Sequence, residues 1–174
     1  MSVQSDDTVD GLDERTLTLI ADRLGREPRG LRAVAAWDER GEPMVIRVAS
    51  LVEGKPFPTL YWLIDPVLSL RLDRDEAGGL IAKIQDEVDS SERLREQLVS
   101  DHRQHISLRE SFLNGEERAS LHANGLWGAL ANRGIGGIGN FDRVRCLHTW
   151  YASHLVVPNT VGQLVDEYWN SFKG

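Results

Sequence analysis

Strand-like and helix-like segments occupy different parts of this chain, which limits the folds open to it. Three short runs in the first third are rich in apolar and β-branched side chains, and only a few turn residues separate them. Connections this short join antiparallel strands, because parallel strands need a long crossover. The sequence therefore predicts a three-stranded antiparallel meander formed by residues 31–37, 44–51 and 59–64.

Helical spacing of apolar residues dominates the remainder. Asp13 can cap a first short helix and Gly25 can end it. The predicted helices cover approximately residues 14–24, 73–88, 91–113, 116–130, 141–156 and 161–172, the fourth being interrupted at residues 124–125. Because strands come early and helices late, we predict an α+β fold in which about five to six helices cover one face of the small sheet.

The chain length and composition indicate one globular domain. A chain of 174 residues suits a single domain, which we place at residues 13–174. The first part of the chain is acidic and polar, and residues 1–12 are therefore predicted to form a disordered tail.

The charge and the apolar content exclude several kinds of partner. The net charge of −7 argues against sequence-independent binding to nucleic acid or to an anionic membrane, since both require a basic face. No apolar run approaches the roughly 20 residues of a membrane-spanning helix. The single cysteine, Cys146, cannot form an internal disulfide, and no signal peptide is recognisable. We therefore expect a soluble cytoplasmic protein that binds neither nucleic acid nor a membrane.

A glycine-rich loop offers the strongest chemical clue in the sequence. It spans residues 134–139, directly before the helix predicted at residues 141–156. Backbone N–H groups of such a loop and the positive end of a helix dipole together bind anions. We predict that the loop glycines and two nearby arginines hold an anionic ligand. These ligand-binding residues are Gly134, Gly136, Gly137, Gly139, Arg143 and Arg145.

The same loop also has a purely structural interpretation. No strand directly precedes it, as a dinucleotide-binding fingerprint would require, and it lacks the lysine and hydroxyl residue that close a P-loop. The loop can equally be a tight connection between two helices, with Ile135 and Ile138 inserted into the core. The sequence leaves both interpretations open.

Three basic side chains share one side of the helix predicted at residues 91–113. His102, His105 and Arg109 have helical spacing and border the apolar stripe of that helix. Arg109 can make a bidentate contact with an anion, and either histidine can act as a general acid or base. The alternative is that these groups are satisfied by backbone carbonyls or carboxylates, as inward polar groups usually are.

Cys146 and His148 carry side chains that bind zinc or perform nucleophilic catalysis. On a regular helix they point about 200° apart and cannot chelate one ion. A zinc site would therefore have to join His148 to His102 or His105. Arg145 and the helix dipole can lower the thiol pKa of Cys146, although a lone cysteine in a helix is more often a small buried apolar group. We predict no resident metal or cofactor, with zinc as the alternative.

Three stretches of the chain resemble the bacterial family DUF501, a domain of unknown function. They are residues 54–66 (GKPFPTLYWLIDP), residues 102–109 (HRQHISLR), and residues 134–137 (GIGG) with 144–155 (VRCLHTWYASHL). The resemblance covers roughly residues 30–168, with Thr160 at a position where the family's closing motif has proline. It implies a bacterial cytoplasmic protein and carries no established activity.

The function we expect from the sequence is the binding of a small phosphorylated or carboxylated ligand. If the protein is an enzyme, the expected reaction is hydrolysis or group transfer. The catalytic groups would then be His148, His102, His105 and Cys146. Two alternatives are a non-catalytic protein-interaction module and a zinc-binding Cys/His domain. The sequence leaves self-association open.

Overall fold

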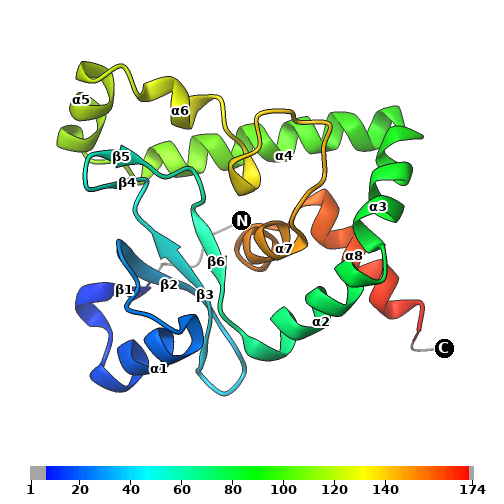
Figure 1. Ribbon diagram of the computed structural model, residues 1–174, viewed down its shortest axis with the longest axis horizontal. Helices are drawn as coiled ribbons and strands as arrows, with labels where there is room; N and C mark the ends of the chain where they lie inside the picture. The colour runs from blue at the N-terminus through cyan, green and yellow to red at the C-terminus, as the bar shows by residue number, and fades with distance from the viewer. Residues whose placement is uncertain (1–6, 173–174) are drawn as a thin grey trace.

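The structure, a computed structural model that describes residues 7–172, contains a four-stranded antiparallel sheet and a separate small hairpin (Figure 1). The strands are β1 (Asp7–Thr8), β2 (Leu31–Trp37), β3 (Pro43–Val48), β4 (Leu51–Val52), β5 (Lys55–Pro56) and β6 (Tyr61–Leu63). The sheet has the order β1-β2-β3-β6, and β4 pairs with β5 in the hairpin. Strands β2, β3 and β6 form the predicted meander, in which Ile46 lies between Val34 and Trp62.

Strand β1 pairs with the outer edge of β2 and belongs to the segment that was predicted to be a disordered tail, residues 1–12. The next residues, Val9–Gly11, form a short 3₁₀ helix, η1. This part of the segment therefore has regular structure. The same prediction for residues 1–6 lies outside the described residues.

Eight α-helices account for most of the described chain and confirm the α+β class. They are α1 (Glu14–Leu24), α2 (Pro66–Ala77), α3 (Leu80–Asp89), α4 (Glu92–Ser111), α5 (Gly115–Ala123), α6 (Trp127–Ala131), α7 (Leu147–Val156) and α8 (Thr160–Asn170). A second 3₁₀ helix, η2, spans Ile135–Gly137. The count exceeds the predicted five to six partly because α2 begins at Pro66, directly after its N-cap Asp65, and ends at Ala77, so that Gly78 and Gly79 separate it from α3. A proline at the first helical position is compatible with the helix, since its missing N–H has no partner there.

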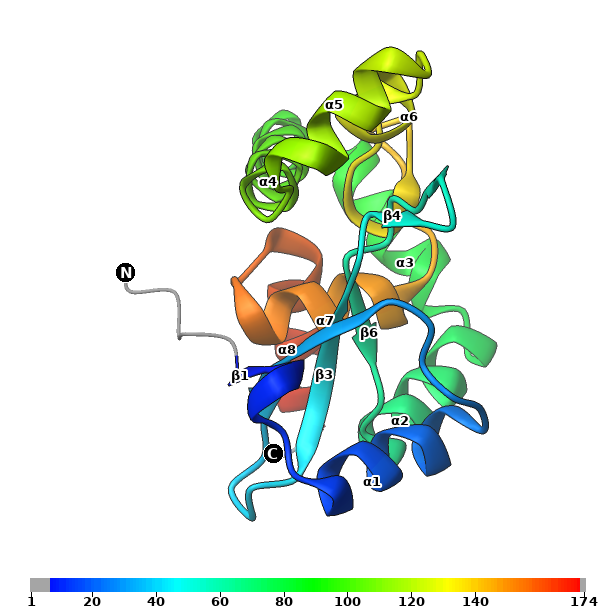
Figure 2. The same ribbon diagram turned by 90° about the vertical axis from the view of Figure 1, so that its left-hand side faces the viewer.

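Helices cover both faces of the sheet, whereas the sequence predicted that they cover only one. On one face, Ile20 of α1 packs against Val34 of β2 and Ile46 of β3. On the other face, Val45 and Tyr61 pack with Ala152 of α7. Figures 1 and 2 both place α1 at one end of the molecule and α4, α5 and α6 at the opposite end. Both faces of β3 are therefore buried, which explains why its sequence is apolar on both sides.

Helix α7 begins at Leu147, six residues later than the start predicted from the sequence. The preceding segment is held by Gln85 of α3, whose side chain accepts a hydrogen bond from the Val144 N–H (2.8 Å) and donates one to the Asp142 carbonyl (2.9 Å). Asn140 adds a local turn by accepting the Asp142 N–H (3.0 Å). These contacts compete with helical hydrogen bonds over residues 141–146, so the glycine-rich loop does not lead directly into a helix.

Helix α7 lies at the centre of the molecule, between the sheet and the group formed by α2, α3 and α8 (Figure 1). Its Trp150 is fully buried in the main apolar cluster together with Leu98 of α4 and Val161 of α8. No helix of the described residues is both long and apolar enough to cross a membrane.

Candidate functional site

His102 binds the backbone of the glycine-rich loop. Its Nδ1 accepts a hydrogen bond from the Ile135 N–H at 3.0 Å, and its ring stacks on Phe141 at 4.6 Å between ring centres. The imidazole lies so close to Gly134 that a Cβ at that position would be 2.1 Å from Nδ1. Burial lowers the pKa of His102 to about 4 and keeps the ring neutral, as an acceptor of this hydrogen bond must be.

The glycines of the loop occupy positions where neighbouring elements pack too closely to leave room for a side chain. Gly136 and Gly137 have φ values of +69° and +71°, which side-chain-bearing residues rarely adopt. A Cβ at Gly136 would lie 2.7 Å from the Thr149 hydroxyl. Ile135 and Ile138 are buried, as the structural interpretation of this loop required. The arrangement is that of a tight connection anchored in the core.

Arg109 also binds backbone. Its guanidinium donates to the carbonyls of Pro58 (2.8 Å), Leu130 and Arg133 (2.5 Å), and the residue has no solvent exposure. Backbone carbonyls from three segments therefore occupy guanidinium N–H groups of Arg109 that would be needed to bind an anion. Arg109 therefore links α4 to the segment before β6, to the end of α6 and to the start of the glycine-rich loop.

The predicted anion site is not assembled in the form expected from the sequence. Arg143 and Arg145 are exposed, as is Gly139 at the end of the loop. The N-terminus of α7 lies at Leu147, whose N–H donates to the Glu76 carboxylate at 2.6 Å. A carboxylate of the chain itself thus sits where the helix dipole would attract an anion.

His105 points to a different place from His102. It lines a cavity between α4 and the α7–α8 connection, and it is 6% exposed. Burial, with smaller contributions from Arg109 and His102, lowers the pKa of His105 to about 3. Neither His102 nor His105 is in the group of side chains that surrounds His148.

A second group of predicted residues does come together. Cys146, His148 and Glu76 of α2 form what we call the Glu–Cys–His cluster, in which one ligand atom of each residue lies within 4.8 Å of the others. The Cys146 thiol is 3.8 Å from His148 Nδ1, and a Glu76 carboxylate oxygen is 3.3 Å from the same nitrogen. The prediction that Cys146 and His148 point apart on a helix is wrong, because Cys146 is the N-cap residue of α7 and has extended backbone angles.

The second nitrogen of His148 faces acceptors on α2. Nε2 is 3.1 Å from an Asp73 carboxylate oxygen and 3.2 Å from the Ser69 carbonyl. The contact with the Cys146 thiol, supported by Glu76, raises the pKa of His148 to about 9 against the opposing effect of burial. Burial alone would raise the pKa of the Cys146 thiol, but its hydrogen bond with His148 lowers it below its ordinary value.

Glu76 and Asp73 were not predicted from the sequence as members of a site. Both lie in the acidic stretch of residues 73–76, at the start of the helix predicted at residues 73–88. Their spacing of three places both carboxylates on one side of α2. That spacing was a usable signal, but only the packing of α2 against α7 shows that this side meets Cys146 and His148.

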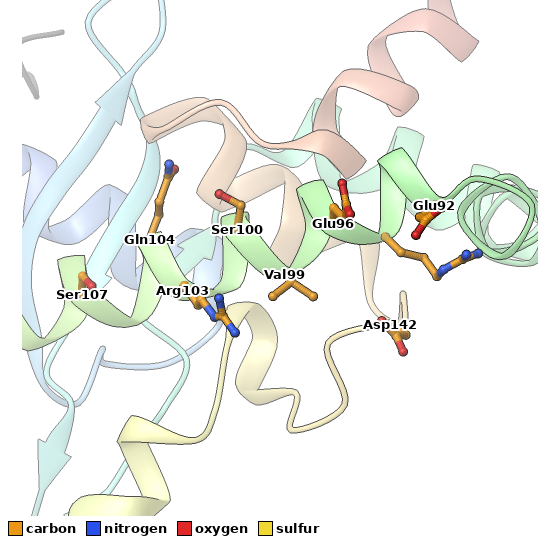
Figure 3. Close-up of a pocket in the computed structure, with 9 residues that line it drawn as sticks. Glu92, Glu96, Val99, Ser100, Arg103, Gln104, Ser107 and Asp142 are labelled. Carbon is orange, nitrogen blue, oxygen red and sulfur yellow. The ribbon is translucent and has the colours of Figure 1, made fainter.

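Two hollows differ in their relation to this cluster. One of about 290 Å³ lies beside His148 and is lined by Phe57, Trp62 and Thr149 among others. A larger one of about 800 Å³ follows the exposed side of α4 (Figure 3). Its wall carries carboxylates and guanidinium groups spread along a single helix, with Asp142 opposite, which is typical of a solvated surface.

The fold and this site define an α+β protein in which thiol, imidazole and carboxylate groups meet between two helices. The model of the family described as "Protein of unknown function (DUF501)" matches residues 34–167, so the chain belongs to the DUF501 family. Comparisons with curated proteins and with solved structures give no match.

Proposed function

We propose that this protein is a zinc-dependent enzyme whose metal ion is bound by Glu76, Cys146 and His148. Thiolate, imidazole and carboxylate are the three ligand types that zinc uses in proteins. Here one of each converges at a single place, and this convergence carries the proposal. The zinc site considered from the sequence, with His102 or His105 as partners of His148, is replaced by one that includes Glu76.

Two of the three separations between the ligand atoms suit tetrahedral coordination, and the third is at most 4.8 Å. Typical zinc–ligand distances place a sulfur and a nitrogen ligand about 3.6 Å apart, and an oxygen and a nitrogen ligand about 3.4 Å apart. The corresponding distances are 3.8 Å between Cys146 Sγ and His148 Nδ1 and 3.3 Å between Glu76 Oε1 and His148 Nδ1. Small side-chain adjustments would therefore suffice to bind the ion.

The surroundings of His148 support a ligand role for its Nδ1. When Nε2 carries the proton and donates it to Asp73 or to the Ser69 carbonyl, Nδ1 presents its lone pair to the metal. A carboxylate behind a ligating histidine is the common outer-shell partner in zinc sites. Glu76 and a Cys146 thiolate would together balance the charge of a divalent cation.

Three protein ligands leave a fourth position for water or substrate, which is the pattern of catalytic rather than structural zinc. Zinc lowers the pKa of bound water to about 7 and so provides a hydroxide for hydrolysis. The open position would also take a small anion. The anionic ligand expected from the sequence is therefore better placed here than at the glycine-rich loop. The hollow lined by Phe57 and Trp62 would hold an apolar part of the substrate.

Cobalt substitution tests this proposal directly. Apoprotein titrated with Co²⁺ should bind one equivalent and develop a thiolate-to-cobalt absorption band, which reports on Cys146 because the chain has no other cysteine. Azide added to the cobalt form should change the visible spectrum, because it enters the open position. An unchanged spectrum would indicate a closed structural site, and absence of one-equivalent binding would exclude the metal centre.

Substitutions in the Glu–Cys–His cluster test which side chains bind the metal ion. We expect Cys146→Ser to abolish the absorption band and Glu76→Gln to weaken Co²⁺ binding at least tenfold. Asp73→Asn should weaken it by about 10–100-fold, as loss of an outer-shell partner does. Glu87→Gln, on α3 and outside the cluster, is the matched control and should bind like the wild type. If Glu76→Gln also binds like the wild type, the ligand set is wrong.

A thiol nucleophile is the second candidate, favoured by the exposure of Cys146 and by the chain of contacts from its thiol through His148 to Asp73. In this case the thiolate would attack substrate and His148 would transfer the proton. Alkylation by iodoacetamide distinguishes the two functions. Bound Zn²⁺ should protect Cys146 from alkylation in a metal enzyme, whereas Zn²⁺ would have no effect in a thiol enzyme that binds no metal.

A further inference from the structure

The ring of a buried histidine, His105, lines a cavity that the proposed metal centre does not use. The cavity has a volume of about 180 Å³ and lies between α4, β6 and the connection from α7 to α8. His105 Nε2 is buried and has no hydrogen-bond partner among residues 7–172. A buried polar atom left unpaired is unfavourable by about 1–3 kcal/mol, so it calls for a ligand or a bound water.

The remaining walls of the cavity indicate an uncharged ligand. Much of the lining is apolar and comes from Leu108, Ile135, Val157 and Pro158. Asp101 is the one ionisable carboxylate among the lining residues, and its Oδ2 accepts the Thr160 N–H at 2.8 Å, at the N-terminus of α8. This contact with the helix terminus stabilises the Asp101 carboxylate, but burial outweighs it and raises the pKa of Asp101, while burial keeps His105 neutral.

The size of the cavity limits the ligand to about one ring. A protein cavity of about 150 Å³ lined by apolar side chains accommodates benzene. The cavity beside His105 is slightly larger and adds polar groups on one side, among them the buried Ser153. A ring with one hydroxyl group would fill the apolar part and place its oxygen at the imidazole. A hydroxyl suits either tautomer of His105, because it both donates and accepts a hydrogen bond.

We infer that this cavity is a binding site for a small uncharged ring compound bearing one hydroxyl group, with the hydroxyl bonded to His105 Nε2. The site lies apart from Glu76, Cys146 and His148, none of which lines the cavity. Its ligand is recognised by shape and by one hydrogen bond, and not by charge.

Phenol, benzene and benzoate are the probes for this site. Phenol should bind saturably to the full-length protein and raise Tm by about 3–6 °C at ten times its Kd. Benzene lacks the hydroxyl and should bind at least tenfold more weakly, and benzoate should not bind because of its charge. In ¹⁵N-labelled protein, phenol should shift the Nε2 resonance of His105, whereas the resonances of His122 should not move.

Two variants connect these effects to His105. His105→Leu removes the unpaired nitrogen and should bind phenol and benzene equally well. Ser107→Ala, an exposed change two residues away on α4, should retain the tenfold preference. Equal binding of phenol and benzene to the wild type would refute the role of His105. No saturable phenol binding, or an unmoved Nε2 resonance, would show that the cavity holds water only and overturn the inference.

Discussion

Gly134 has no room for a side chain because the imidazole of His102 lies against it. A Cβ would be 2.1 Å from Nδ1, and either the loop or the histidine would have to move. We expect Gly134→Ala to lower the free energy of unfolding by about 3 kcal/mol, from overpacking together with loss of the Ile135–His102 hydrogen bond. Urea denaturation measures this change.

Gly139→Ala is the matched control within the same loop. The added Cβ would lie 3.1 Å from the guanidinium of Arg133, whose exposed side chain can move away. The expected loss is below about 0.5 kcal/mol. Equal losses in the two variants would mean that the contact with His102 does not set the requirement for glycine at position 134.

Single residues were predictable from the sequence where helical spacing alone determines their position. The shared side of His102, His105 and Arg109 follows from their spacing, and all three are buried on α4. Their partners were not predictable. Arg109 bonds to carbonyls 21 to 51 residues away, and no local pattern distinguishes a carbonyl partner from an anionic ligand.

Arg109 connects α4 to three other segments, so its substitution should affect the stability of several elements at once. Arg109→Met keeps the apolar stem but leaves the carbonyls of Pro58, Leu130 and Arg133 without this donor. We expect a loss of more than about 3 kcal/mol in the free energy of unfolding, since hydrogen bonds from charged groups contribute about 1.5–3 kcal/mol each. Amide exchange should become faster at residues 130–138 than in the sheet.

Arg118→Met is a suitable comparison, because within residues 7–172 Arg118 donates to one carbonyl, that of Glu110. Its loss should be smaller than half that of Arg109→Met. If both variants lose the same stability, the three contacts of Arg109 are not additive and the glycine-rich loop is held by its own packing.

Element boundaries show where local patterns stop being informative. The predicted N-cap Asp13 is confirmed, because a cap and its helix are neighbours in the chain. The start of α7 was not predicted correctly, because Gln85, 59 residues before Val144, holds the segment in front of it. The Glu–Cys–His cluster was missed for the same reason, since Glu76 meets Leu147 and His148 across 71 and 72 residues.

The whole molecule contains two buried neutral histidines, which couples its stability to pH. Burial holds the pKa of His102 at about 4 and that of His105 at about 3, against about 6.5 in an unfolded chain. Between these values the unfolded state binds protons that the folded state does not. The contribution of these two histidines to stability is therefore fully present above about pH 7 and decreases as the pH falls. His148 acts in the opposite direction, because its pKa is raised to about 9, so its contribution is fully present below about pH 6 and is lost as the pH rises through about 9.

The two histidines together should lower the free energy of unfolding by about 4 kcal/mol between pH 7 and pH 5. His105→Leu should remove about half of this difference, because one of the two proton-binding groups is gone, and Ser107→Ala should retain all of it. Urea denaturation of the three proteins at pH 7, 6 and 5 measures the effect. The lowered pKa values of Asp13 and Asp38 act below this range, since an unfolded aspartate binds protons only near pH 4. The same pH dependence in the wild type and in His105→Leu would show that His105 is protonated in the folded protein, which its burial opposes.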